Sequence, residues 1–387
     1  MKTVYFDHAA TTPLDERVLE AMKPYLTEHF GNANSAHQMG NQAKVAVEDA
    51  RETIADIIGA EPAEIIFTSG GTESDNSAIK GVVKATGKSE VVTSPLEHHA
   101  VLHTAEALKQ DGGRPVYVEP NPDGTVNPQK VADAITENTA LVSLMHVNNE
   151  IGSINPLKEI SEVCREHNIP FHSDTVQSIG KIPVNVDELG LDFLSMSAHK
   201  IYGPKGIGVL YMRHATPWLP WMHGGSQERR RRGGTLNVPG IVGLAKALEL
   251  AVEEMDQHAR HFKKLRSRLV SGLDKKFGDR YQINCNKEKC APHIVNLSFT
   301  DTGEQFDGEM LLLNLDVEGI CVSNGSACTS GTIEPSHVLD NIGLDNKVAN
   351  SSIRISMGKD NTEDDIDYLL EKLEIVINRM ASKAPTS

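Results

Sequence analysis

The fold class of this 387-residue chain follows from residues 65–73, Ile65-Ile66-Phe67-Thr68-Ser69-Gly70-Gly71-Thr72-Glu73. The first four residues are a short apolar run typical of a buried strand, and a helical pattern follows the glycines. Apolar runs at 91–93, 141–146 and 169–173 continue the series, with predicted helices between them. Repeated strand–helix units imply right-handed crossovers, so we predict an α/β fold with a mostly parallel sheet covered on both faces.

The pattern changes past about residue 256, where the strand–helix alternation ends. We expect a long charged helix over 258–273, strands at 294–299 and 353–356, and a closing helix that begins near Thr362. These elements predict a smaller α+β domain. The expected division is a large domain over residues 15–256 and a small domain made of residues 1–14 and 257–387.

The first helix is predicted from its start signal. Thr12 can cap the helix, Pro13 fits the first helical position, and Asp15 faces the positive end of the helix dipole. A helical apolar stripe follows, made of Val18, Leu19, Met22, Tyr25 and Leu26.

Composition and charge argue against several classes of protein. Lys and Arg number 38 against 53 Asp and Glu, a formal net charge of −15, whereas binding to DNA or anionic membranes needs clustered positive charge. The sequence has no run of 18 apolar residues and no apolar signal core near its start. Five cysteines are an odd, sparse set that suits a reducing compartment. We therefore expect a cytoplasmic enzyme with no nucleic-acid or membrane partner.

The loops that follow strands are expected to carry the chemistry, because ligands bind at the carboxyl ends of strands in an open parallel sheet. In residues 69–73, glycines let backbone N–H groups approach an anion, and the helix N-terminus adds partial positive charge. This pattern predicts a phosphate cradle, with an ordinary tight turn as the alternative. Residues 203–208 look like a P-loop but lack its Lys and Ser/Thr, so we predict a hairpin there.

Lys200 and Asp174 end two strands of the predicted sheet. A lysine beside Ser197 and His199 at a strand end is a candidate for forming a Schiff base. Asp174 has Gln177 one turn later. Pyridoxal 5'-phosphate requires a lysine that forms an imine and an aspartate that keeps the pyridine nitrogen protonated. The alternative is a surface ion pair between Lys200 and Asp174.

The tandem histidines His98 and His99 have three interpretations. A metal site finds little support, because the nearest further ligand, His103, has no Glu or Asp at the usual spacing. His98 stacked on a flat cofactor and acting as acid or base is the second interpretation. A core or surface histidine is the third. We predict no intrinsic metal site.

Cys328 lies in a Gly/Ser/Thr-rich stretch, residues 323–332, after the predicted strand 320–322. Such a stretch is expected to be exposed and mobile. Structural cysteines prefer burial, so Cys328 is a candidate reactive thiol, whereas Cys321 in the strand is expected in the core. The absence of a Cys-x-x-Cys pair argues against a zinc or redox-disulfide site.

One basic run stands out in this acidic sequence: four arginines, residues 229–232, lie between Glu228 and Thr235. On an acidic protein, such a run is typical of a solvated face or a subunit contact. Binding of a phosphate or a substrate carboxylate by part of the run is the alternative.

Together these loops resemble the cysteine desulfurases, the NifS/IscS-like branch of the class-V aminotransferase group. The resemblance runs from residues 5–13 to residues 352–358. Its most specific pieces are Met145-His146-Val147-Asn148-Asn149-Glu150-Ile151-Gly152, Ser197-Ala198-His199-Lys200-Ile201-Tyr202-Gly203-Pro204-Lys205-Gly206 and Gly325-Ser326-Ala327-Cys328-Thr329-Ser330-Gly331. The implied fold is that of fold-type-I pyridoxal phosphate enzymes, aspartate aminotransferase-like, with the cofactor in the large domain and the cysteine loop in the small one.

The resemblance implies a role for each matching position. Lys200 would hold the cofactor covalently and later move protons, and Cys328 would accept the sulfur. The other implied roles are Asp174 at the pyridine nitrogen, Gln177 at the phenolate oxygen, His98 stacked on the ring, Gly71, Thr72, Ser197 and His199 at the phosphate, Thr235 at the phosphate of the neighbouring subunit, and Asn149 and Arg354 lining the cofactor and gripping the substrate carboxylate.

The implied reaction removes sulfur from L-cysteine and leaves L-alanine and a persulfide on Cys328, in a homodimer. A free cysteine is mostly thiol at neutral pH, so we expect the substrate thiol or His98 to exchange a proton with Cys328. Sulfur would pass to an iron–sulfur scaffold or a thiolation relay, and Cys328 could ligate a cluster transiently. A longer C-terminal extension often docks the scaffold in this family, whereas this sequence ends in a short polar tail, so the acceptor stays open.

Two alternatives accompany this interpretation. A selenocysteine lyase, or another pyridoxal phosphate enzyme that eliminates or transaminates, needs no mobile thiol at position 328. A non-catalytic interaction protein on the same scaffold is disfavoured by the intact Lys200, Asp174 and Cys328. The sequence departs from the family at Gly71, where alanine is frequent, and its long cysteine loop argues against the short-loop SufS-like branch.

Overall fold

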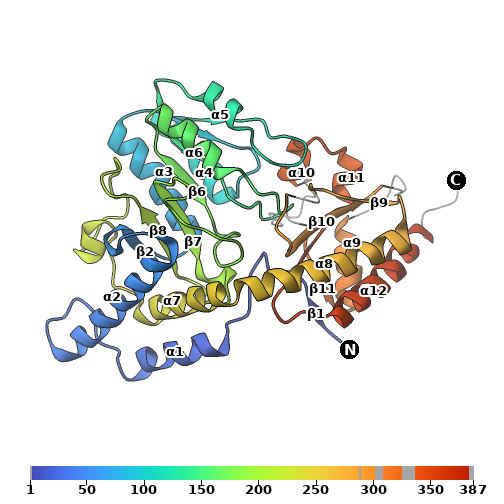
Figure 1. Ribbon diagram of the computed structural model, residues 1–387, viewed down its shortest axis with the longest axis horizontal. Coiled ribbons are helices and arrows are strands. Elements are labelled where there is room, and N and C mark those ends of the chain that lie inside the picture. The colour runs from blue at the N-terminus through green and yellow to red at the C-terminus, as the bar shows by residue number, and fades with distance from the viewer. Residues whose placement is uncertain (1, 287–288, 301–307, 325–335, 383–387) are drawn as a thin grey trace.

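The computed structural model describes residues 2–286, 289–300, 308–324 and 336–382, which form two lobes (Figure 1). The larger lobe holds a seven-stranded sheet and the helices around it. The long helix α8 (Met255–Phe277) runs from the larger lobe into the smaller one, where the chain's N-terminal strand also lies.

The large sheet has the strand order β2-β8-β7-β6-β5-β3-β4. Its strands are β2 (Ile65–Thr68), β3 (Glu90–Thr93), β4 (Arg114–Tyr117), β5 (Thr139–Ser143), β6 (Phe171–Asp174), β7 (Phe193–Ser197) and β8 (Gly208–Met212). Neighbours from β4 to β7 pair in parallel, and β8 runs antiparallel to β7 and β2. The predicted mostly parallel sheet is confirmed, as is the antiparallel connection around residues 203–208.

Helices cover both faces of this sheet. On one face lie α3 (Gly71–Thr86) and α4 (His99–Ala107), where Ile79 and Val101 join a buried cluster with Ile66 and Leu210 of the strands. On the other face lie α2 (Gln38–Ile58), α5 (Pro128–Ala134), α6 (Leu157–Glu166) and α7 (Val238–Glu253).

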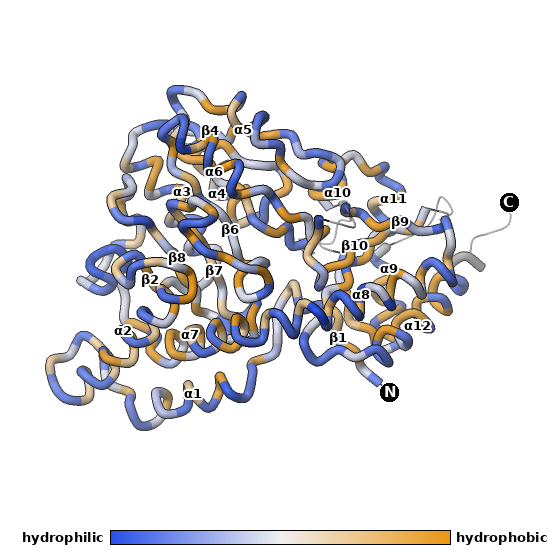
Figure 2. Tube along the Cα trace, in the orientation of Figure 1, coloured by the Kyte–Doolittle hydropathy of each residue, from blue (hydrophilic) through white to orange (hydrophobic). Residues whose placement is uncertain are grey.

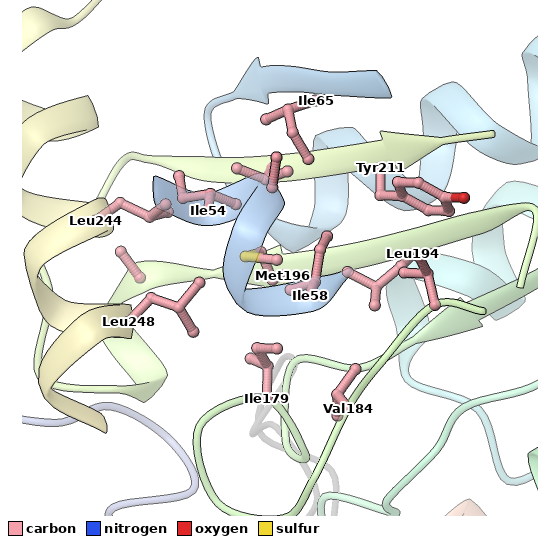
Figure 3. Packing of buried hydrophobic residues seen from close by; sticks show 14 of the residues in the cluster. Ile54, Ile58, Ile65, Ile179, Val184, Leu194, Met196, Tyr211, Leu244 and Leu248 are labelled. Atoms are coloured by element: carbon pink, nitrogen blue, oxygen red, sulfur yellow. The ribbon is translucent and has the colours of Figure 1, made fainter. Parts of the chain in front are cut away.

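Figure 3 shows the core between α2, α7 and the sheet. Ile54 and Ile58 of α2 and Leu248 of α7 lie close to Leu194 and Met196 of β7, and all five side chains are buried. Burying one such side chain contributes roughly 1.5–3 kcal/mol. Helix α2 ends at Ile58, and Gly59 is its C-cap, because a φ of 75° is a left-handed conformation that glycine adopts without strain.

Helix α1 (Glu16–Thr27) begins later than its sequence predicts. Its N-cap is Asp15, whose carboxylate accepts from the Arg17 N–H, so the predictions of Thr12 as cap and Pro13 as first helical residue are wrong. The Thr12 hydroxyl instead accepts from the Tyr202 N–H (2.8 Å) and donates to the His199 carbonyl (3.0 Å). This long-range pairing ties the N-terminal segment to the loop after β7.

The smaller lobe has its own core. A three-stranded antiparallel sheet of order β12-β10-β9 packs against helices α8, α9 and α12, and β1 pairs in parallel with β11. The bounds are β1 (Val4–Tyr5), β9 (Tyr281–Ile283), β10 (Ile294–Phe299), α9 (Gly308–Val317), β11 (Ile320–Cys321), α10 (His337–Asn341), α11 (Asn346–Asn350), β12 (Ile353–Ser356) and α12 (Glu363–Ser382). Val4 and Phe6 belong to this core. We therefore propose the division into residues 15–256 and residues 1–14 with 257–387.

Apolar residues gather in the strands and inner helix faces, and hydrophilic residues colour the outer turns of α8 and α12 (Figure 2). In the part of the chain that the structure describes, no helix has both the length and the apolar composition that a bilayer crossing requires.

Candidate active site

A cleft of roughly 470 Å³ lies at the carboxyl ends of the parallel strands, where the two lobes meet. Of the predicted site residues, the structure brings together Gly71, Thr72, His98, Asn149, Asp174, Gln177, Ser197, His199, Lys200 and Arg354 as its lining. Thr235 is exposed and lies outside this lining. Cys328 lies outside the described residues.

Lys200 reaches the cleft from the short 3-10 turn Ala198–Lys200, which follows β7 directly. Its Nζ donates to the carbonyls of Ala9 and Ala10, both at 2.6 Å. Burial lowers the pKa of Lys200 to about 8, and the positive charge of Arg354 adds to this effect. A sizeable fraction of the amine is therefore neutral near pH 7.5, which is the form that attacks carbonyl groups.

The pH dependence of Lys200 can be measured on the cofactor-free chain. Acetylation of Lys200 by acetic anhydride, followed by mass spectrometry, should rise with pH with a midpoint near 8. An unperturbed lysine titrates at about 10.4. In Arg354→Leu the midpoint should move to higher pH, because one nearby positive charge is removed. A midpoint above about 10 in the unaltered chain would contradict this account.

Asp174 ends β6 and is buried in the cleft floor. The Val176 N–H donates to its Oδ1 at 2.9 Å, which leaves Oδ2 for a donor in the cleft. Burial raises the pKa of Asp174 to about 7, and the negative charge of Asp75 raises it further. A cationic group placed against Asp174 would favour the ionised carboxylate, so the site suits a protonated ring nitrogen.

A buried histidine, His172, lies next to the carboxyl group of Asp75. The His172 ring lies between Ser143 Oγ (2.8 Å from Nδ1) and Ser195 Oγ (3.0 Å from Nε2), and its Nε2 is 3.5 Å from Asp75. Burial lowers the pKa of His172 to about 4, so the ring is neutral at physiological pH. Neither His172 nor Asp75 was expected from the sequence.

Gln177 is held at both ends of its amide. Its Nε2 donates to the Ala9 carbonyl (2.8 Å), and its Oε1 accepts from Lys181 Nζ (3.1 Å). Because a carbonyl group only accepts, the Ala9 contact fixes which amide atom is the nitrogen. Burial lowers the pKa of Lys181 to about 7. Lys181 was missed by sequence reasoning, although a lysine four residues after Gln177 in an otherwise uncharged run was a usable signal.

His98 caps helix α4 and opens onto the cleft. Its Nδ1 accepts from the Ala100 N–H at 3.1 Å, so the ring proton lies on Nε2. Burial lowers the pKa of His98 to about 4, and the positive charge of Lys200 lowers it further.

His99 stacks on His103 with ring centroids 4.8 Å apart. Among the described residues no group of His, Cys, Asp and Glu is arranged to hold a metal ion.

Arg232 and Glu73, which lie outside the cleft lining, hold the glycine loop before α3 in place. Arg232 pairs with Glu73 (2.8 Å), whose other oxygen accepts from the Ser69 N–H (2.7 Å). A Cβ at residue 71 would lie 2.9 Å from Val176 Cγ2. An alanine at residue 71 would therefore require the Val176 side chain to shift, whereas Gly71 needs no such shift.

Two other arginines of the run also make contacts within the chain. Arg231 donates to the Ala63 carbonyl, and Arg229 lies 3.9 Å from Glu48. The residue before the run, Glu228, is buried and pairs with Arg51 at 2.7 Å. Arg231 and Arg232 are half-buried, whereas Arg229 and Arg230 are exposed, and a solvated face or a subunit contact stays a prediction for this run.

Arg354 enters the cleft from β12 of the smaller lobe. Its Nη2 pairs with Asp7 (2.8 Å), its Nη1 donates to the Asn149 carbonyl (2.9 Å), and its Nε is buried without a partner among the described residues. The backbone of Arg354 pairs with Ser323. Ser323 and His337 both line the cleft, so the chain enters and leaves the segment that contains Cys328 at the cleft.

The sequence and structure comparisons agree over almost the whole chain. Residues 4–369 match the family Aminotransferase class-V. Cysteine desulfurase IscS of Dictyoglomus turgidum is 47% identical over 386 residues, 99% of this chain and 97% of that protein. The chain belongs to the cysteine desulfurase family. Cysteine desulfurase IscS of Methanosarcina thermophila is 46% identical over 387 residues, 99% of this chain and 94% of its own.

A solved NifS-like protein has the same fold as this cysteine desulfurase family member. The TM-score is 0.91 at 42% identity, and the match covers 98% of this chain and 100% of that one. The fold and family expected from the motifs at 145–152 and 197–206 are therefore confirmed.

Proposed function

We propose that this chain removes sulfur from L-cysteine with pyridoxal 5'-phosphate as cofactor, giving L-alanine and a persulfide on Cys328. The observation that carries the proposal is the meeting of Lys200, Asp174 and Arg354 in one cleft. The described flanks of the Cys328 segment, Ser323 and His337, line the same cleft. Family membership supports the same reaction.

The residues of the cleft fit the cofactor. Lys200 would hold it covalently, and the buried carboxyl group of Asp174 would face its ring nitrogen. Gly71 and Thr72 begin α3, where backbone N–H groups and the helix dipole favour a phosphate, and Ser197 and His199 line the same cleft. When bound, pyridoxal phosphate withdraws electrons from the substrate and so weakens the bonds at its α-carbon.

Two further side chains would orient the ring. The Lys181 contact turns the Gln177 amide so that its NH₂ group, not its oxygen, is available to the phenolate oxygen. His98 is a neutral, flat ring at the cleft, which suits stacking on an aromatic cofactor.

Arg354 would bind the substrate carboxylate. Its guanidinium group carries a permanent charge and can form paired hydrogen bonds to two carboxylate oxygens. The contacts with Asp7 and with the carbonyl of Asn149 hold the guanidinium in the cleft. Binding the carboxylate there fixes the orientation of the substrate's α-carbon relative to Lys200.

Lys200 would move the protons at carbon, and His98 would stabilise a thiolate. Neutral Lys200 takes the substrate α-proton at Nζ and returns protons to carbon. With Nδ1 engaged by the helix, the neutral His98 ring presents its Nε2–H to the cleft and would donate to a thiolate there, so the Cys328 proton would pass to the thiolate form of the substrate. The Cys328 thiolate attacks the substrate sulfur and forms an S–S bond, and the electron pair of the broken C–S bond stays with the carbon that becomes the alanine methyl group.

A second copy of the chain would complete the site. Thr235 is exposed outside the cleft of its own chain, as expected for a residue that reaches a neighbour's phosphate. Large apolar side chains are exposed on and beside α1, namely Leu14, Leu19, Leu26 and Phe30, so a homodimer would cover them. The sulfur would pass to an iron–sulfur scaffold or a thiolation relay in the cytoplasm, and Cys328 would be able to ligate a cluster transiently.

The products of L-cysteine turnover test this function. With the cofactor-loaded chain we expect L-alanine and sulfur, recovered as sulfide after addition of a thiol reductant, in equal amounts. Pyruvate and ammonia in place of alanine would show β-elimination and would contradict the proposal. A selenocysteine lyase would release alanine from selenocysteine but not from L-cysteine.

A further inference from the structure

Cys285 and Cys290 lie side by side in the smaller lobe, just after β9 and just before β10. The neighbouring backbone holds them there: the Asn284 N–H donates to the Asn296 carbonyl (2.9 Å), and the Ala291 N–H donates to the Gly152 carbonyl (2.8 Å). Both cysteines are half-buried thiols. The two side chains share a hydrogen bond.

A cation faces this pair. Arg266 of α8 places Nη2 at 3.7 Å from Cys285 Sγ, and its Nη1 is fixed by the Ile294 carbonyl at 2.7 Å. The Cys290 hydrogen bond and the Arg266 charge lower the pKa of Cys285, against burial and the negative charge of Asp123. The same hydrogen bond raises the pKa of Cys290. Of the two sulfurs, Cys285, which lies next to Arg266, is therefore the one that ionises more readily.

Two other described cysteines have the opposite environment. Cys164 is buried on α6, where burial raises its pKa to about 12. Burial and the carboxylates of Asp316 and Asp7 raise the pKa of Cys321. A thiolate that is accessible and next to a second cysteine is the arrangement found in cysteines that form reversible disulfides.

We propose that Cys285 and Cys290 form a dithiol–disulfide couple that reacts with small-molecule disulfides. One such disulfide is cystine, the oxidised form of the substrate cysteine. The Cys285 thiolate attacks one sulfur of cystine, forms a mixed disulfide and releases one cysteine. Cys290 then loses its proton and attacks Cys285 Sγ, which forms the internal disulfide and releases the second cysteine. Two protein thiols are oxidised, and one cystine is reduced to two cysteines.

The Cys285–Cys290 pair packs against segments close to the residues that line the cleft. Cys285 packs against a buried cluster that includes Leu96, Ile151 and Val338. Cys290 pairs through its backbone with Ser153, three residues after the cleft residue Glu150. The absence of a Cys-x-x-Cys motif argued against a redox disulfide here, but folding brings together two cysteines that four residues separate.

Cystine treatment of the full-length, cofactor-loaded chain tests the proposal. Trypsin cuts after Lys287 and Lys289, and endoproteinase Asp-N cuts before Asp301, so the Cys290 peptide is separated from Cys321 and Cys328 and stays joined to the Cys285 peptide only by a disulfide. In the unaltered chain we expect the linked peptides. In Cys290→Ser we expect a stable mixed disulfide on Cys285. In Cys285→Ser we expect Cys290 to react with cystine at least about tenfold more slowly than Cys285 does in Cys290→Ser, because the Cys290 thiolate is scarce.

Replacement of Arg266 tests whether its positive charge increases the reactivity of Cys285. Arg266→Gln should slow the reaction of Cys285 near neutral pH about tenfold, and Arg266→Lys should retain most of the rate because it keeps the charge. Equal rates in Cys285→Ser and Cys290→Ser, or no linked peptides in the unaltered chain, would overturn the proposal. Circular dichroism before treatment shows that each variant is folded.

Discussion

Lys200→Ala is expected to reduce the turnover of L-cysteine by at least about 10³-fold, because it removes both the covalent attachment of the cofactor and the group that moves the α-proton. Proton transfer by a positioned side chain alone contributes about 10²–10⁴-fold. The matched control is Lys205→Ala, because Lys205 is exposed in the connection between β7 and β8 and lies outside the cleft lining.

The Lys200 variant has a second readout besides turnover. Pyridoxal phosphate should stay with the unaltered chain through extensive dialysis, and should be lost from Lys200→Ala but not from Lys205→Ala. Added methylamine should restore part of the lost turnover, since a free amine can move the proton. A Lys200→Ala chain that keeps activity within tenfold of the original would contradict the assigned role.

Asp174→Asn is expected to lower kcat by about 10²–10³-fold, the range for loss of one preorganised electrostatic group. Asparagine keeps the size of the side chain and can still accept the Val176 N–H, but it cannot stabilise a protonated ring nitrogen. The matched control is Asp192→Asn. Asp192 also accepts a backbone N–H beside the sheet, from Phe171 at 2.9 Å, but it lies outside the cleft lining.

The two aspartate variants should differ in kcat while sharing similar thermal stability. The absorption spectrum of the bound cofactor should change in Asp174→Asn and stay unchanged in Asp192→Asn, because only the first side chain is placed to face the ring. An unchanged spectrum and a kcat within threefold of the original in Asp174→Asn would refute the assignment.

The strands with continuous apolar runs could be predicted from the sequence. Residues 65–68, 294–299 and 353–356 form strands with the predicted bounds. β4 was missed because it is an edge strand with a proline and exposed ends, and so has no apolar run. The start of α1 was misplaced because Thr12 pairs with Tyr202 and His199, two partners that local sequence does not reveal.

Several cleft residues could be predicted because they lie at the ends of strands. Lys200 and Asp174 follow strands, and the carboxyl ends of parallel strands meet at one edge of a sheet. Lys181 and Arg266 could not be found this way, because their roles depend on which side chains they meet after folding. Cys321 was expected in the core, but the end of its short strand leaves it half-buried.

The most direct test of the central claim is the mass of the peptide that contains Cys328 after the cofactor-loaded chain has been exposed to L-cysteine. We expect a gain of about 32 Da, one sulfur atom, on this peptide. Addition of a thiol reductant should remove the gain, and Cys328→Ala should neither show it nor release sulfide at more than a small fraction of the original rate. Alanine formed at the normal rate by Cys328→Ala, or an unmodified Cys328 peptide during steady turnover, would contradict the account.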